Sequence, residues 1–165
     1  KDNLASEKMI NIFKERKTIE QVEEGNELAP KFDENGLMPV VTTDAKTGDV
    51  LMLGYQNEEA LKLTIQTGEA HYWSRSRECL WHKGATSGLI QKIIDIRIDD
   101  DQDSIWLKVE LQGLEASCHV GFKSCFYRSI PTGNIKDEIK LIYKEDEKTF
   151  DPKDIYGDAP NPTKL

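Results

Sequence analysis

The sequence predicts an α+β fold in which one or two helices accompany a mostly antiparallel sheet. Three observations support this prediction: several runs rich in β-branched residues lie between polar turns, one segment carries helix caps at both ends, and no internal repeat is present. The chain has 165 residues, of which 38% are hydrophobic and 32% are charged. This composition suits a single globular domain with a real hydrophobic core.

The N-terminal part of the chain predicts a helix, and the main domain is expected to follow it. Residues 6–24 are polar and weakly amphipathic, too sparsely apolar to form a core by themselves. The main domain is expected to begin near Phe32. The runs 39–43 and 50–55 are rich in β-forming residues and flank a polar, glycine-bearing stretch, so they predict a β-hairpin.

The strongest helix signal lies between Asn57 and Gly68. Asparagine is favoured at the N-cap and glycine suits the left-handed residue that ends a helix, while Leu61 and Ile65 supply apolar positions between them. After this helix we expect strands, in chain order, at 71–74, 89–98 and 104–111, with shorter ones at 125–130 and 139–143.

The chain divides into three predicted parts. These are an N-terminal helical extension at 1–31, a main domain at 32–143 and a polar C-terminal tail at 144–165. The tail is rich in charged residues and punctuated by prolines, so we expect its end to be unstructured.

The charge of the chain restricts its partners. A formal net charge of −8 repels polyanions at long range, which argues against binding to nucleic acids or anionic membranes. No apolar run approaches the roughly 20 residues of a membrane-spanning helix. We therefore expect a cytoplasmic protein with neither nucleic acid nor membrane as a partner, and a local basic pocket for any anionic ligand.

An acidic run between two predicted strands is a candidate cation site. Alternate residues of an extended segment point to one side, so Asp99, Asp101 and Asp103 are able to converge while Asp100 faces away. Clustered carboxylates favour hard cations such as magnesium or calcium. The alternative interpretation is a solvated turn, which is the usual meaning of a local excess of charge.

The cysteines suggest a second, softer metal site. Three cysteines are an odd number, which fits metal ligation or free thiols better than a disulfide framework. Cys118 and Cys125 are candidate zinc ligands, although small buried apolar residues are an equally good interpretation of their spacing. His119 follows Cys118 directly, which makes it a candidate acid or base.

A basic segment predicts phosphate recognition. Arginine forks, hydroxyls and glycine-exposed amides gather there in an otherwise acidic chain. The alternative is a solvent-facing strand followed by a glycine-rich turn. The candidate substrate-binding residues are Arg75, Arg77, Lys83, Thr86 and Ser87.

Together these motifs resemble the phosphoribosyl-AMP cyclohydrolases, enzymes of histidine biosynthesis. The resemblance covers roughly residues 32–128 in the order of that family. It is carried by the segments 32–37, 50–55, 67–77, 80–88, 118–121 and 124–128.

The resemblance implies an intertwined homodimer of small α+β protomers that binds Zn²⁺ and Mg²⁺. It implies zinc held at the interface by cysteines from both chains, with Cys118 and Cys125 matching two of them. It also implies magnesium on Asp99, Asp101 and Asp103, and proton transfer by His119.

One position departs from the family pattern. Asp100 stands where the family usually has the cysteine that completes the zinc site. Zinc also accepts a carboxylate oxygen, so Asp100 is the first candidate for the third ligand, and Cys79 is the alternative.

The implied reaction is hydrolysis of the N1–C6 bond of the adenine ring of 1-(5-phosphoribosyl)-AMP, which gives a ring-opened formimino-carboxamide ribonucleotide. A zinc-activated water is expected to attack C6, with magnesium and the basic residues holding phosphates. Two alternatives stay open: a related zinc hydrolase acting on another purine nucleotide, and a noncatalytic, metal-stabilised nucleotide-binding module.

Overall fold

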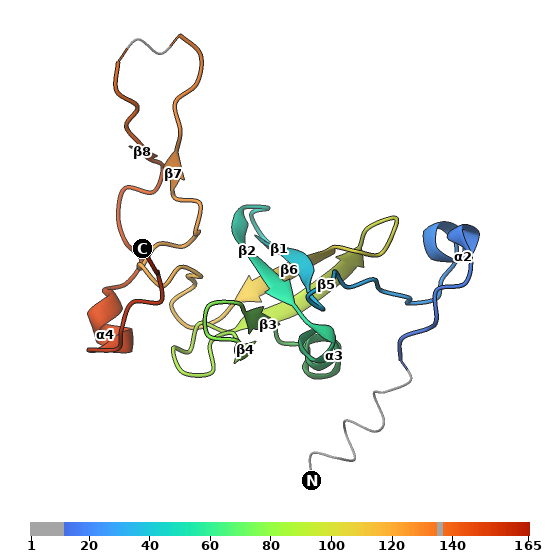
Figure 1. Ribbon diagram of the computed structural model, residues 1–165. Coiled ribbons are helices and arrows are strands. Elements are labelled where there is room, and N and C mark those ends of the chain that lie inside the picture. Colours follow the sequence, from blue (N-terminus) through green and yellow to red (C-terminus); the bar gives the residue numbers. More distant parts are fainter. Residues whose placement is uncertain (1–11, 135–136) are drawn as a thin grey trace.

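A four-stranded sheet forms the centre of the computed structural model, which describes residues 12–134 and 137–165. The sheet has the order β2-β1-β6-β5 (Figure 1). β1 and β2 pair antiparallel, as do β5 and β6, whereas β1 and β6 are parallel. The predicted α+β class with mostly antiparallel pairing is therefore confirmed, and one parallel pair joins the two hairpins. The strand bounds are β1 Met38–Asp44, β2 Val50–Gln56, β5 Gln91–Ile98 and β6 Ile105–Leu111.

Helix α3 follows the first hairpin, as the sequence predicts. It spans Glu58–Thr67, and the Asn57 side chain accepts a hydrogen bond from the Ala60 amide at 2.8 Å. Gly68 is left-handed, with φ 72°, and donates its N–H to the Thr64 carbonyl. Because both caps are local signals, the sequence alone predicts this helix.

A second, smaller hairpin covers α3 and the edge of the sheet. It consists of β3 (His71–Ser74) and β4 (Cys79–His82), which pair antiparallel. The sequence predicts β3, whereas β4 lies in the basic segment, for which a solvent-facing strand was the alternative to phosphate recognition. β7 (Arg128–Ser129) and β8 (Ile142–Tyr143) are much shorter than the predicted strands at those places, and they form an arm that extends away from the sheet in Figure 1.

The N-terminal helix is shorter than predicted. Within the described residues it is α2, which spans Ile19–Glu24, and the part of the prediction at 1–11 lies outside the described residues. Thr18 and Gln21 form a capping box, which fixes the start of the helix at Ile19. The residues before Thr18 serve other contacts instead: Phe13 lies against Phe32, with their ring centroids 6.3 Å apart.

The hydrophobic core lies between one face of the sheet and the layer made by α3, β3 and β4. Alternate residues of β6 are buried, whereas the residues between them are half-buried on the other face. The buried members of this core are Met38, Val40, Leu51, Met52, Leu61, Ala70, Tyr72, Ile105, Leu107, Val109 and Leu111.

The end of the chain is not unstructured, which corrects the expectation for the tail. Helix α4 spans Pro152–Tyr156, and Phe150 is buried in a second cluster with Leu89 and Ala116. The segment is fastened to the domain by three apolar residues spaced through it, Phe150, Ile155 and Tyr156. No helix among the described residues has the length and apolar character of a membrane span.

Candidate functional site

The loop at 117–125, called the cysteine loop below, brings two thiols together. The Ser117 amide donates to the Lys123 carbonyl at 2.8 Å, and the Cys118 amide donates to the Phe122 carbonyl at 3.1 Å. This tight turn brings the side chains of Cys118 and Cys125 close enough for each to shift the pKa of the other. Cys118 is buried and Cys125 is exposed, so the pair is accessible from one side.

The two thiols differ in acidity because each acts on the other. The hydrogen bond from Cys125, together with the amides of Val120 and Phe122, lowers the pKa of Cys118 to about 6 against the cost of burial. The same contact raises the pKa of Cys125. The pair is therefore a ready source of thiolate, the form that binds metals.

The cysteine loop is anchored to the first hairpin. The Lys123 ammonium lies 2.9 Å from an Asp44 carboxylate oxygen and 3.1 Å from an Asp49 oxygen. The Ser124 hydroxyl donates to the Val50 carbonyl at 2.6 Å, and the Cys125 amide donates to the Leu51 carbonyl at 2.7 Å. These contacts fix the position of Cys125 relative to β2.

A buried chain of hydrogen bonds connects the same loop to the core. The Tyr72 hydroxyl donates to Gln91 Oε1 at 2.6 Å and lies 2.6 Å from Thr42 Oγ1. Gln91 Nε2 then donates to Ser117 Oγ at 3.1 Å. Because Tyr72 has one hydroxyl proton, which it gives to Gln91, Thr42 is the donor in the first bond. Sequence analysis gave no signal for this network, since its members are far apart in the chain.

Lys83 and His119 lie beside the cysteine pair. Lys83 is only 3% exposed, and burial lowers the pKa of its ammonium, while its interaction with the two cysteines raises it. His119 is half-buried, and burial likewise lowers the pKa of its imidazole. The Asn161 side chain and Thr163 Oγ1, the latter 3.5 Å from His119 Nε2, reach this ring from the C-terminal end. Lys83 thus lies with the thiols, and its ammonium is also 5.5 Å from the centre of the Trp81 ring, over which Arg77 lies.

The other predicted substrate-binding residues lie on two neighbouring loops. Arg75 and Arg77 are exposed on the turn between β3 and β4, with their guanidinium groups over the rings of Tyr55 and Trp81. Thr86 and Ser87 belong to the glycine-flanked loop after β4, where Ser87 Oγ accepts the Leu89 amide at 3.2 Å. Arg75, Arg77 and Thr86 are exposed, whereas Ser87 is half-buried.

The acidic residues form a turn, not the extended segment that was expected, yet three carboxylates still gather. Oxygens of Asp99, Asp101 and Asp103 all lie within 4.8 Å of one another. Asp99 Oδ1 accepts the amides of Asp103 and Ser104 at 2.9 and 3.1 Å, which closes the turn. The hydrogen bond with Asp101, burial and Asp99 together raise the pKa of Asp103 to about 6, as expected for crowded like charges.

The N-terminal extension holds this acidic turn in place, which sequence analysis did not predict. The Gln102 side chain is buried: its oxygen accepts the Ala29 amide at 2.8 Å and its nitrogen donates to the Val22 carbonyl at 2.9 Å. Gln102 has φ 56°, a left-handed backbone. Arg16 donates to the Asp101 carbonyl at 2.9 Å. No local pattern marked Gln102, because its partners precede it by more than seventy residues.

The acidic turn and the cysteine loop lie at opposite ends of the β5–β6 pair. Ser117 contacts Gln91, the first residue of β5, whereas Asp99 follows Ile98, its last residue. An eight-residue strand is on the order of 20 Å long. Among the described residues, no Asp, Glu or His and no further Cys forms a three-membered group with Cys118 and Cys125. Asp100 and Cys79 are therefore not beside the pair within one chain.

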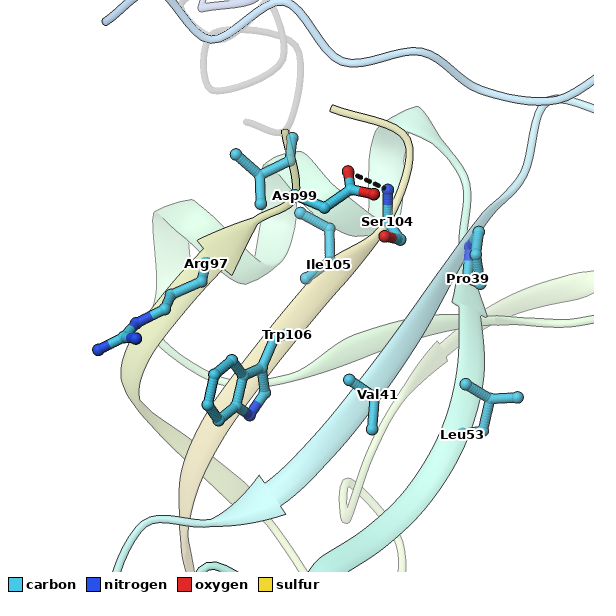
Figure 2. Close-up of a pocket in the computed structure, with 9 residues that line it drawn as sticks. Pro39, Val41, Leu53, Arg97, Asp99, Ser104, Ile105 and Trp106 are labelled. Carbon is cyan, nitrogen blue, oxygen red and sulfur yellow. Dashed lines mark hydrogen bonds between the residues drawn. The ribbon is translucent and has the colours of Figure 1, made fainter. Parts of the chain in front are cut away.

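The outer face of the sheet carries an apolar hollow beside the acidic turn. Figure 2 shows Val41, Leu53 and Trp106 lying side by side on adjacent strands, with Asp99 and Ser104 at the rim. The hollow has a volume of about 350 Å³. Leu53 is 56% exposed, which is unusual for a leucine in the middle of a strand.

Comparison with known proteins gives one family. The family model described as phosphoribosyl-AMP cyclohydrolase matches residues 52–127. A protein of that name from Rhodopseudomonas palustris is 54% identical over 138 residues, which cover 84% of this chain and 90% of the relative. Its namesake from Nitrobacter winogradskyi is 49% identical over 140 residues, covering 85% and 94%. A third, from Rhizobium etli, is 50% identical over 136 residues, covering 82% and 89%.

Proposed function

Because this chain belongs to the phosphoribosyl-AMP cyclohydrolase family, we propose that it hydrolyses the N1–C6 bond of the adenine ring of 1-(5-phosphoribosyl)-AMP. The product is the ring-opened formimino-carboxamide ribonucleotide of histidine biosynthesis. The same proposal assigns the enzyme to the cytoplasm. The observation that carries it is the pair of facing thiols beside His119, in a chain that shares about half of its residues with relatives of that name.

We assign Cys118 and Cys125 as zinc ligands. Two adjacent thiols, one buried and one exposed, fit two corners of a tetrahedral zinc site and leave the others open. A bound zinc ion would supply an activated water. Asp99, Asp101 and Asp103 offer clustered carboxylate oxygens that suit Mg²⁺, which would position the substrate or neutralise a phosphate.

The third zinc ligand is the reason to propose a homodimer. Asp100 of the same chain lies at the far end of β5, on the order of 20 Å from the cysteine loop. If Asp100 completes the zinc site, it must be Asp100 of the partner subunit. Two equivalent sites, each built from the thiols of one protomer and the acidic turn of the other, follow from a two-fold axis.

The outer face of the sheet supports the same arrangement. The hollow lined by Val41, Leu53 and Trp106 is apolar and lies beside the acidic turn. Burial of this face against a second copy would remove exposed leucine from water and bring the acidic turn to a partner. The exposed apolar residues of the β7–β8 arm, Ile139, Leu141, Ile142 and Tyr143, add a further surface that association would cover.

Several side chains are assigned to the substrate. Arg75, Arg77, Thr86 and Ser87 lie on two exposed loops and would bind phosphate oxygens, with the guanidinium forks contributing paired hydrogen bonds. Lys83 would add positive charge close to the thiols. His119 would transfer the proton to the ring nitrogen as the N1–C6 bond breaks.

Ring opening by the purified protein tests the proposal. With zinc and magnesium added, we expect turnover of 1-(5-phosphoribosyl)-AMP and no turnover of AMP. The measurement is the change in purine absorbance on ring opening. Turnover of another purine nucleotide in its place would favour a related hydrolase. Tight binding of the nucleotide without ring opening would favour a noncatalytic module, and either result would overturn the assignment.

The role of His119 has its own test. We expect His119→Asn to lower kcat by about 10²- to 10⁴-fold, the usual contribution of a general acid or base, with little change in KM or in zinc content. An equal loss of zinc would instead make His119 a residue that maintains the metal site.

The choice between Asp100 and Cys79 is decided by metal analysis. Zinc content and turnover are measured in Asp100→Ala and Cys79→Ser, with Cys118→Ser as the reference for a lost ligand. We expect zinc to be lost from Asp100→Ala and kept by Cys79→Ser. The reverse result would assign the third ligand to Cys79.

A further inference from the structure

The C-terminal segment makes a paired contact with the cysteine loop just before Cys125. Glu145 Oε1 accepts the Lys123 amide at 2.8 Å, and Glu145 Oε2 accepts the Ser124 amide at 2.9 Å. Hydrogen bonds from N–H groups to a carboxylate are about twice as strong as neutral ones, and two of them fix an orientation as well as a distance. Glu145 is half-buried, so this contact is partly shielded from water.

A second contact joins the same two segments on the other side of the loop. The Gly121 carbonyl accepts the amides of Thr149 and Phe150 at 2.7 and 3.3 Å. A Cβ atom at Gly121 would lie 2.4 Å from the Phe150 carbonyl oxygen, so this close approach requires glycine. Phe150 is 8% exposed and packs on Leu89 and Ala116, which fastens the segment to the domain.

The loop gains from this support because two of its backbone N–H groups, those of Lys123 and Ser124, find no partner within the loop itself. Ser117 and Cys118 are held through the amides described above, and Cys125 is bound to β2. The peptide units of Lys123 and Ser124, between these fixed points, donate their N–H groups to Glu145 alone among the described residues. Without Glu145 these two N–H groups would turn toward water. The backbone here would then be held only by the Lys123 carbonyl and the two side chains, so the separation of the two thiols would be less tightly fixed.

We propose that Glu145 is a positioning residue for the zinc site: its carboxylate clamps the backbone at Lys123 and Ser124 so that the thiols of Cys118 and Cys125 face each other. This inference rests on the proposed function of the two cysteines as zinc ligands. Glu145 lies outside residues 52–127, which the family model matches, and no sequence motif points to it.

The test compares Glu145→Ala and Glu145→Gln with Glu147→Ala. Glu147 is exposed and forms no hydrogen bond or ion pair within the described part of the chain, so its variant controls for loss of charge. Zinc affinity is measured by competition with a coloured chelator. We expect about a 10- to 100-fold loss for Glu145→Ala, the range found for groups that orient metal ligands, a smaller loss for Glu145→Gln, and no change for Glu147→Ala.

A second readout needs no metal. In metal-free protein, the rate at which iodoacetamide alkylates each cysteine is followed by peptide mass spectrometry. We expect buried Cys118 to react several-fold faster in Glu145→Ala, while exposed Cys79 reacts at its wild-type rate and serves as an internal reference. If Glu145→Ala does not unfold cooperatively, and so is not properly folded, Glu145→Gln is compared with the wild type in its place.

The outcomes separate the two proposals. The role of Glu145 would be overturned if Glu145→Ala and Glu145→Gln bound zinc with the wild-type affinity and Cys118 were alkylated at the wild-type rate in both. With turnover intact, that result would leave the proposed function standing. Failure of the wild-type protein to bind zinc or to open the ring would overturn the proposed function. In that case the alkylation rates in metal-free protein still decide whether Glu145 holds the two thiols together.

Discussion

The buried hydroxyl of Tyr72 joins β1, β3 and β5 through two hydrogen bonds of 2.6 Å each. Tyr72 is 0% exposed, so no water is able to replace a lost partner. We expect Tyr72→Phe to lower the free energy of unfolding by about 1–3 kcal/mol, because Thr42 and Gln91 are left with unpaired buried groups. Urea titration followed by circular dichroism measures this change.

Tyr55→Phe is the matched control for that prediction. Tyr55 is half-buried, its ring contacts Arg75, and its hydroxyl makes no hydrogen bond within the described residues. We expect the free energy of unfolding of Tyr55→Phe to stay within about 0.5 kcal/mol of the wild-type value, as is usual for surface substitutions. Equal losses in the two variants would mean that the buried chain through Gln91 contributes nothing.

The ion pair of Asp44 and Lys123 makes stability depend on pH. Burial raises the pKa of Asp44, but the Lys123 ammonium and the backbone amides of Lys46 and Thr47 together hold it below its ordinary value of 3.8. Burial lowers the pKa of Lys123, but the carboxylates of Asp44 and Asp49 together raise it above 10.5. The ion pair therefore contributes its full stabilisation at pH values between 3.8 and 10.5. It is lost as pH falls through the lowered pKa of Asp44, or rises through the raised pKa of Lys123.

Asp44→Asn tests this dependence. Near pH 7 we expect the free energy of unfolding to fall by about 1–3 kcal/mol, since a partly buried charge loses its partner. The difference from the wild type should shrink below pH 3.8, where the wild-type carboxylate also becomes neutral. Asp49→Asn should cost less, because Asp49 is 59% exposed. A difference that stays constant with pH would exclude the ion pair as its cause.

Single residues show what a sequence can indicate about a site. Cys118, His119 and the aspartates stand out because their chemistry lies in short local motifs, and their roles stay predictions. Gln91 was not, because its amide acts on Ser117, which is 26 positions away. Glu145 likewise reads as one more acidic residue of a polar tail, and only the folded chain brings it to the amides of Lys123 and Ser124.

Two glycines at the ends of neighbouring elements test how backbone geometry supports the site. Gly68 and Gly84 both have positive φ, 72° and 90°. A Cβ at Gly68 meets nothing within 4 Å, whereas one at Gly84 would lie 2.3 Å from the Ile90 amide nitrogen. We expect Gly68→Ala to cost about 1–2 kcal/mol of unfolding free energy from strain alone, and Gly84→Ala about 3 kcal/mol or more.

Both variants are measured by the same denaturant titration, so Gly68→Ala serves as the control for strain. Equal costs would mean that the loop after β4 moves freely away from Ile90.

At the scale of elements, local signals decide what is predictable. The prediction of helix α3 was correct because Asn57 and Gly68 mark both of its ends. The N-terminal helix was predicted too long, because the capping box of Thr18 and Gln21 competes with the weak periodicity before it. β4 was only the alternative interpretation of the basic, glycine-rich segment, because its status as a strand depends on pairing with β3.

The whole molecule is organised by one long-range pairing. β1 and β6 lie parallel, with Val40 opposite Ile105, although more than sixty residues separate them in the chain. Nothing local specifies this pairing, so the sequence predicted the first hairpin and the strands at 89–98 and 104–111 without their order in the sheet. Its consequence is that the acidic turn and the cysteine loop lie at opposite ends of the β5–β6 pair, which makes a shared site between two protomers testable by mixing variants.

Cys118→Ser and Asp100→Ala should each be inactive alone and should complement each other when mixed. In a mixed dimer, one site combines the intact thiols of one chain with the intact Asp100 of the other, and the second site carries both defects. Random exchange makes about half of the dimers mixed, so roughly a quarter of the wild-type turnover should return.

Refolding the two variants together from denaturant ensures exchange, and each variant refolded alone is the control. Recovery cannot arise if each chain builds its own site, because every site would then keep its single defect. Mixtures that stay inactive, while light scattering shows that mixed dimers have formed, would contradict the shared site. The thiols of Cys118 and Cys125 would then require a third ligand other than Asp100, and Cys79→Ser in the same exchange with Cys118→Ser would show whether that cysteine acts across the interface.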